Sequence, residues 1–124
     1  MEALIIQGTD DSPKVILDAE NKKMEISGRS LPEDVSTFYK PIIEWVNEYS
    51  KQPNQLTVLA FKLDYFNTAS SKNILNILLK LKDIHETGNE VLVEWHYQED
   101  DDDMLETGIE YARVVKIPFK NIRY

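Results

Sequence analysis

The amino-acid sequence predicts an α/β fold, with one domain over residues 1–124 in which helices pack on a mixed β-sheet. A chain of 124 residues suits one domain that buries its own core. Apolar residues recur with the periods of strands and of helices along the whole chain, without a repeat or a linker. A continuous apolar stretch, a short polar segment, a helix and another strand follow one another, which indicates one right-handed parallel crossover.

The N-terminal part is predicted to form three strands, at Leu4–Gln7, Lys14–Asp18 and Lys23–Ser27. The last two flank the polar segment Ala19–Lys22, which suits a tight turn. These two strands are therefore expected to pair as a hairpin.

A helix is predicted to begin at residues 31–34, where Pro32 suits the first turn and two acids follow it. We expect Ser30 or Leu31 at its cap, and residues 52–54 end it. Pro41 predicts a kink, or a division into a short helix and a longer one. Its buried face consists of apolar residues at helical spacing: Val35, Phe38, Ile42, Trp45, Val46 and Tyr49.

The middle of the chain predicts a buried strand followed by a long helix. Leu56–Leu63 is almost continuously apolar, which is typical of a central strand covered on both faces. Asp64–Ala69 is predicted to be a loop, and Ser70–Glu86 the helix, with Thr87–Asn89 as its stop signal.

The C-terminal part predicts a strand, a helix and a further strand. Glu90–Gln98 alternates apolar and polar residues, as a strand does. Asp100–Asp103 opens the last helix, and Val114–Pro118 is predicted to be a closing strand. The inner face of this helix is expected to carry Leu105, Ile109 and Ala112.

The charge argues against two classes of partner. The formal net charge is −8 and the sequence pI is about 4.7, so the surface repels nucleic acid and anionic membranes. No apolar run reaches the roughly 18 residues of a membrane span, and the N-terminus lacks a basic signal-peptide region, so we expect a cytoplasmic protein. The absence of cysteine excludes disulfides, thiolate metal sites and a cysteine nucleophile.

The most informative segment is Asp64–Lys72, which lies where the buried strand leads into the long helix. Loops at the carboxyl ends of parallel strands commonly carry function in α/β sheets. One interpretation is structural, with Asn67, Thr68 or Ser70 simply capping the helix. The other is a phosphorylation site, because a phosphate gains from the free N–H groups of a helix start and could pair with Lys72.

Other residues have plainer interpretations. Asp100–Asp103 raises the alternative of an acidic metal-dependent hydrolase, but it lacks the spacing of a calcium loop and also suits a helix start. His85 and His96 each lack a second ligand at suitable spacing. Trp45 and Trp95 lie on apolar faces and are expected in the core. With 4 glycines and no nucleotide-binding or nucleophile motif, the sequence predicts no catalytic residue, metal or cofactor.

The chain resembles the SiaC family of bacterial regulatory phosphoproteins over nearly its full length. The resemblance is carried by Thr9–Pro13, Gly28–Glu33, Phe38–Ile42, Trp45–Tyr49, Tyr65–Lys72 and Asp101–Glu106, and the run Tyr65-Phe66-Asn67-Thr68 is its most specific part. It implies a STAS-like domain, as in anti-sigma-factor antagonists, with Thr68 as the phosphoacceptor. It also implies a non-enzymatic protein.

The resemblance further implies three protein partners. A SiaB-like protein kinase phosphorylates Thr68, and a SiaA-like PP2C-type phosphatase reverses the reaction. The unphosphorylated form binds and activates a SiaD-like diguanylate cyclase, which affects cyclic-di-GMP and biofilm formation. A partner switch acting on an anti-sigma factor is the alternative. Ala69 stands where the family usually has Ser. The expected kinase- and partner-facing residues are Tyr65, Phe66, Asn67, Ala69, Ser70, Ser71 and Lys72.

Overall fold

The computed structural model describes residues 1–124, and its six strands lie in the spatial order β1-β2-β3-β4-β5-β6. β2 pairs antiparallel with both β1 and β3, whereas β3, β4, β5 and β6 run parallel to one another. The elements are β1 (Leu4–Ile6), β2 (Lys14–Asp18), β3 (Lys23–Ser30), α1 (Val35–Tyr49), β4 (Leu56–Phe66), α2 (Thr68–Glu86), β5 (Glu90–Tyr97), α3 (Asp102–Val115) and β6 (Phe119–Arg123). The predicted mixed sheet and the hairpin of β2 and β3 are confirmed.

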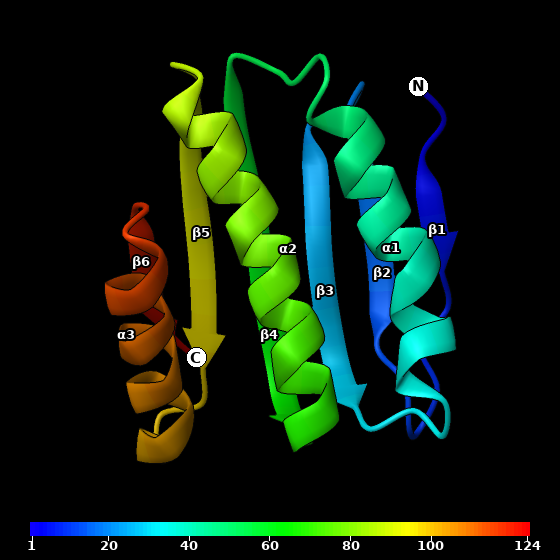
Figure 1. The fold of residues 1–124 in the computed structure, drawn as a ribbon. Helices are drawn as coiled ribbons and strands as arrows, with labels where there is room; N and C mark the ends of the chain where they lie inside the picture. The colour runs from blue at the N-terminus through cyan, green and yellow to red at the C-terminus, as the bar shows by residue number, and fades with distance from the viewer.

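All three helices lie on one face of the sheet, so the molecule has two layers (Figure 1). Figure 1 also shows three right-handed crossovers, through α1, α2 and α3, where the sequence predicted one. The prediction that β4 is covered on both faces is wrong. On the face without helices, Val58 is half-buried and Lys62 is exposed, and only neighbouring strands shield this side of β4. No helix is both long enough and apolar enough to span a membrane.

The start of α1 differs from the prediction. Asp34 is the N-cap, and its Oδ1 accepts a hydrogen bond from the Thr37 N–H at 3.1 Å. Ser30, one of the predicted caps, is instead the last residue of β3 and is fully buried. The helix also runs unbroken through Pro41, which lies on its exposed side, so the predicted division is wrong.

Two predictions for the C-terminal segment are wrong. Val114 belongs to α3, which ends at Lys116 in the left-handed conformation, and the closing strand is β6 rather than 114–118. Ile109, predicted to face inward, is 50% exposed. The buried face of α3 is formed by Met104, Gly108 and Val115, because a glycine lets the helix lie directly against Trp95.

The core lies between the sheet and the helices and confirms the placement of both tryptophans. Trp95 is 1% exposed and packs edge-on against Phe66 and Tyr111. Trp45 is also buried and stacks on Tyr49 with a ring separation of 5.2 Å. The contact of Trp95 with Tyr111 joins α3 to the sheet, and α3 with α2 forms the site described next.

Candidate functional site

The passage from β4 to α2 is a single residue, Asn67, and not the predicted loop 64–69. The strand register changes from Gly28 opposite Leu63 to Arg29 opposite Tyr65, so Asp64 is an extra residue in a β-bulge. The bulge lets β4 continue to Phe66. The chain therefore enters α2 abruptly, at the carboxyl ends of the parallel strands (Figure 1).

Asn67 is the N-cap of α2, so the side chain of Thr68 is not needed to cap the helix. The Asn67 Oδ1 accepts from the Ser70 N–H at 2.8 Å, and its backbone oxygen accepts from the Ser71 N–H at 3.0 Å. Thr68 is exposed, and its hydroxyl makes no hydrogen bond within the chain. The N–H groups of Thr68 and Ala69 belong to the first turn and have no intrahelical acceptor.

Ser70 is the one predicted surface residue that the structure places inside. It is 0% exposed, and its Oγ donates to the Ser30 backbone oxygen at 2.9 Å. The Ser30 Oγ in turn donates to the Ser70 Oγ at 2.9 Å and lies 2.6 Å from the Tyr39 hydroxyl. Burial raises the pKa of Tyr39. Ser70 therefore joins the first turn of α2 to β3 and α1, and it cannot contact a partner.

Thr68 opens onto a groove of about 620 Å³ between the start of α2 and α3. The α3 side of the groove carries the acids Asp103, Glu106 and Glu110, which share one helix face at i, i+3 and i+7. This acidic wall was not predicted from the sequence. The spacing of the three acids is evident in the sequence, but their position beside α2 is not. The whole lining is Phe66, Asn67, Thr68, Ser71, Asp103, Glu106, Thr107, Glu110 and Tyr111.

Tyr111 ties the two sides of the groove together. Its hydroxyl donates to the Ser71 backbone oxygen at 2.9 Å, and burial raises the pKa of Tyr111 to about 12. On the outer side, Arg113 hydrogen-bonds the Glu110 carboxylate and holds its pKa below the usual range. The acidic wall faces a helix start, which favours negative charge.

The other predicted site residues lie around Thr68 in different environments. Ala69 and Lys72 are exposed, and Tyr65 is 49% exposed. Ser71 is half-buried, with its Oγ donating to the Thr68 backbone oxygen at 2.6 Å. Phe66 is half-buried against Trp95.

The acidic run at the start of α3 caps that helix. Asp101 is its N-cap and accepts from the Met104 N–H at 3.0 Å, and Asp102 and Asp103 occupy its first turn. No group of three or more histidine or acidic side chains converges as metal ligands would. His85 is exposed, and His96 lies 3.8 Å from Glu94 in a half-buried pair.

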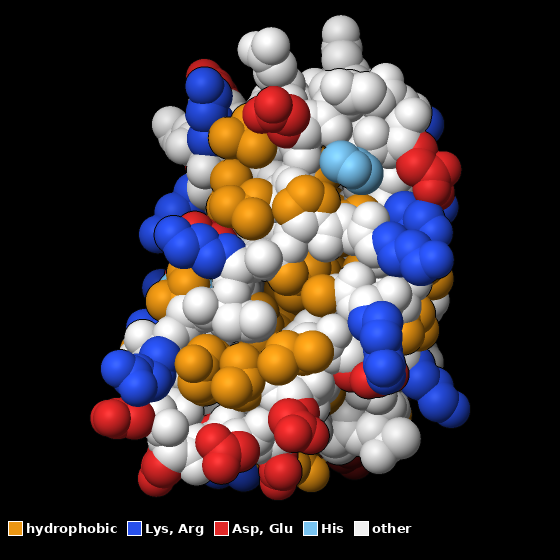
Figure 2. Space-filling view, turned by 90° about the vertical axis from the view of Figure 1, so that its left-hand side faces the viewer, with side chains coloured by type: hydrophobic (Ala, Val, Ile, Leu, Met, Phe, Trp, Pro, Cys, Tyr) orange, Lys and Arg blue, Asp and Glu red, His pale blue; other side chains and the backbone are white.

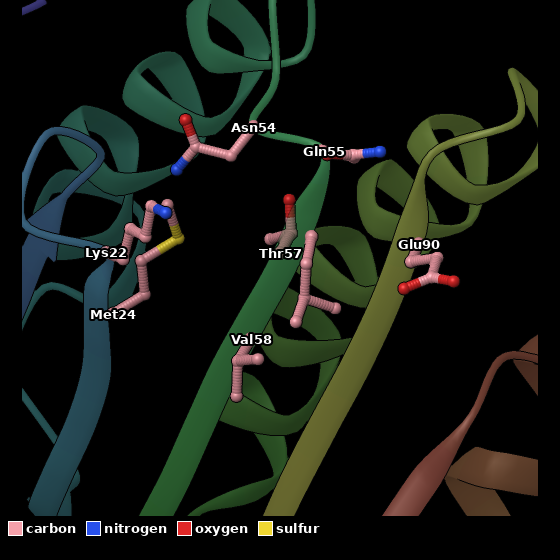
Figure 3. A pocket seen from close by; sticks show the side chains of 8 residues that line it. Lys22, Met24, Asn54, Gln55, Thr57, Val58 and Glu90 are labelled. Atoms are coloured by element: carbon pink, nitrogen blue, oxygen red, sulfur yellow. The ribbon is translucent and has the colours of Figure 1, made fainter.

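A second pocket, of about 280 Å³, lies at the opposite end of the sheet near the amino end of β4. Figure 3 shows Lys22 and Met24 on one side of it and Glu90 on the other, with Thr57 and Val58 between them. Asn54 is engaged in the fold, because its Nδ2 donates to the Ala19 backbone oxygen at 2.9 Å. The pocket gathers no reactive or titratable cluster, so the groove beside Thr68 is the better candidate.

The fold and this groove define a class of small α/β domains that offer a free hydroxyl at the start of a helix. The family model for "SiaC family regulatory phosphoprotein" matches residues 6–124, and the chain belongs to that family. An uncharacterised protein of Pseudomonas aeruginosa strain UCBPP-PA14 is 29% identical over 119 residues, which are 96% of this chain and 94% of that protein.

Solved structures of Pseudomonas aeruginosa SiaC share the fold. Apo-SiaC is 29% identical with a TM-score of 0.89, and the two chains are covered to 98% and 99%. A chain from the crystal structure of diguanylate cyclase SiaD in complex with its activator SiaC is 27% identical with a TM-score of 0.92, over 98% of this chain and 99% of that chain. The six-stranded α/β fold is therefore that of a family with a regulatory role.

Proposed function

We propose that this chain is a non-enzymatic regulatory phosphoprotein in which phosphorylation of Thr68 controls binding to a diguanylate cyclase. In this proposal the unphosphorylated protein binds and activates the cyclase, and so promotes cyclic-di-GMP signalling and biofilm formation. A protein kinase adds the phosphate and a PP2C-type phosphatase removes it. Membership of the SiaC family and the complex of a similar SiaC with the cyclase SiaD support the partner.

One observation supports the choice of Thr68 most strongly. Its hydroxyl is exposed and unbonded, because Asn67 alone caps α2. Of the neighbouring hydroxyls, Ser70 is buried and Ser71 is bonded to the backbone of its own helix. A kinase that reaches this helix start therefore meets one free acceptor.

The physical effect of a phosphate would be electrostatic and steric. It would add about −1.5 to −2 charges beside two free backbone N–H groups, which favour it. It would also enter a groove already lined by Asp103, Glu106 and Glu110. A partner that fits the neutral hydroxyl would then meet a dianion in an acidic groove, and its binding would weaken.

The surface proposed to face the kinase and the cyclase surrounds this hydroxyl. Ala69 and Lys72 lie beside it on α2, and Tyr65 is the large exposed side chain of the preceding strand. The groove is also lined by three half-buried residues, Asn67, Phe66 and Ser71. Only the exposed parts of these side chains would contact a partner.

The acceptor is tested by incubating the protein with its kinase and locating the phosphate by mass spectrometry. Thr68→Ala should abolish the modification. Ser71→Ala and Thr107→Ala are matched controls, because both residues line the same groove but have bonded hydroxyls, and both variants should be modified like the wild type. Phosphate on Thr68→Ala at the wild-type level would reject Thr68 as the acceptor.

Gating is tested by capturing the cyclase with Thr68→Ala and Thr68→Asp. We expect the alanine variant to bind and the aspartate variant to bind less. Because aspartate carries a smaller charge than phosphate, the phosphorylated wild type is the reference. Equal capture by all three proteins would contradict gating even if Thr68 proved to be the acceptor.

A further inference from the structure

The outer edge of the sheet, where β6 lies beneath α3, exposes apolar side chains that no other element covers. Figure 2 looks onto this edge and shows hydrophobic side chains in a broken band, bordered by Lys and Arg, with Asp and Glu gathered at the end where α3 begins. Leu105, Ile109 and Ala112 form a stripe along α3, in which Ile109 is 50% exposed and Leu105 and Ala112 are half-buried. The stripe faces outward, because the residues that line the groove toward α2 occupy the opposite flank of α3.

The backbone of β6 also has one unpaired side, because β6 is the last strand of the sheet. Tyr124 exchanges hydrogen bonds with Tyr97 and Glu99, each at 2.9 Å, so alternate residues of this strand turn toward β5. The alternation turns the N–H and C=O groups of Phe119, Asn121 and Arg123 outward. Such an edge is a template for another strand.

We propose that this edge joins two copies of the chain. The two β6 strands pair antiparallel about a twofold axis that is perpendicular to the sheet and passes beside Asn121. Asn121 of one copy then lies opposite Asn121 of the other, and Phe119 of one copy lies opposite Arg123 of the other. In this register every outward N–H meets a C=O of the other copy. A register centred on Lys120 is disfavoured, because it sets two ammonium groups opposite each other.

The same axis brings the two α3 helices to packing distance. α3 packs on β5 and β6 alike, so its axis lies near the midline between them. With strands about 4.8 Å apart, this midline lies about 4.8 Å from the twofold axis, which puts the two helices roughly 9.6 Å apart. Packed helices are about 8–10 Å apart. Ile109 of one copy would contact Ile109 of the other at the centre of the interface. The small side chain of Ala112 allows the two helices to approach each other closely.

Charge favours the antiparallel arrangement of the helices. α3 begins with Asp102 and Asp103 and ends beside Lys116, so each acidic start meets the basic end of the other copy. Asp102 and Lys116 lie equally far from Ile109 along the helix and therefore face each other across the axis. Although the chain carries a net charge of −8, residues 113–124 contain Arg and Lys and no acid, so the end of α3 and β6 form a basic segment of this edge.

The proposal is tested by measuring the molar mass by light scattering over a dilution series. The concentrated protein should approach twice 14.4 kDa, about 29 kDa, and fall toward 14.4 kDa on dilution. Asn121→Pro should abolish the dimer, and it removes no bond of the fold because the Asn121 N–H points outward. Lys40→Glu, a charge change on the exposed side of α1, should leave the mass unchanged.

A charge swap separates the interface from mere destabilisation. Asp102→Lys and Lys116→Glu should each weaken dimerisation by about fivefold, because the pair occurs twice in the dimer. The double variant should restore it, whereas the unfavourable effects of both changes on the helix dipole would add. A mass of 14.4 kDa at every concentration would overturn the proposal and leave the edge to a strand of another protein. A dimer that survives Asn121→Pro would overturn it as well.

Discussion

Replacing Gly108 with alanine sets helix propensity against packing, and the structure predicts that packing decides the outcome. Alanine is favoured over glycine in a helix interior by about 1 kcal/mol. A Cβ at residue 108 would lie 2.3 Å from Cδ1 and 2.6 Å from Nε1 of Trp95. These distances are roughly 1 Å inside ordinary contact, so either the indole or the helix must move.

The indole cannot give way easily. Trp95 is 1% exposed, and its Nε1 donates to the Met104 backbone oxygen at 2.9 Å. The movement therefore falls on α3. Overpacking of this kind costs about 1–3 kcal/mol, and the propensity gain of about 1 kcal/mol reduces the net destabilisation to at most about 2 kcal/mol. The rings that surround the indole are Phe61, Phe66, Tyr111 and Phe119.

The assay is thermal unfolding followed by circular dichroism. For a domain of this size, Gly108→Ala should lower the melting temperature by up to roughly 10 °C. Thr107→Ala is the control, because the hydroxyl there bonds only to the Asp103 backbone oxygen of its own helix, and it should stay within about 0.5 kcal/mol of the wild type. A Gly108→Ala protein that melts at or above the wild-type temperature would refute the reasoning.

Three further predictions concern the first turn of α2. In urea denaturation, Asn67→Ala should lose about 1 kcal/mol through the missing cap, whereas Thr68→Ala should lose less than about 0.5 kcal/mol; equal losses would contradict the assignment of the cap. Tyr39→Phe and Ser70→Ala should each cost about 1–2 kcal/mol, and a double variant should lose less than the sum if they act as one network. The pKa of Tyr111, raised to about 12, predicts stability that is complete below pH 10 and is lost as the pH rises toward 12; Tyr111→Phe should flatten this decline, and an unchanged slope would refute the contribution of Tyr111.

Much of the fold was predictable because period and turn chemistry agreed with the tertiary structure. Lys14–Asp18 was predicted with its observed bounds, and the long helix was misplaced only by its first two residues. The predictions that failed involve contacts that a linear pattern does not carry. Ile109 was expected inside because it is apolar, yet Gly108 faces the core, since only a glycine fits against the Trp95 ring.

The candidate site shows the same division. The segment could be chosen from its position after a buried strand, but three residues competed for the cap, and only the geometry assigns that role to Asn67. The burial of Ser70 depends on β3 and α1, which are distant in sequence. The acidic wall could not be predicted, because nothing in residues 103–110 indicates that this part of α3 lies beside α2.

The gating role of Thr68 is tested most directly by titrating the cyclase partner in a calorimeter with the unphosphorylated and the Thr68-phosphorylated protein. Thr68→Ala that has been exposed to the kinase serves as the control. The account predicts that the phosphorylated form binds at least about tenfold more weakly, a difference of about 1.4 kcal/mol, while the treated control binds like the unphosphorylated protein. Equal affinity for the two forms of the wild type would contradict it.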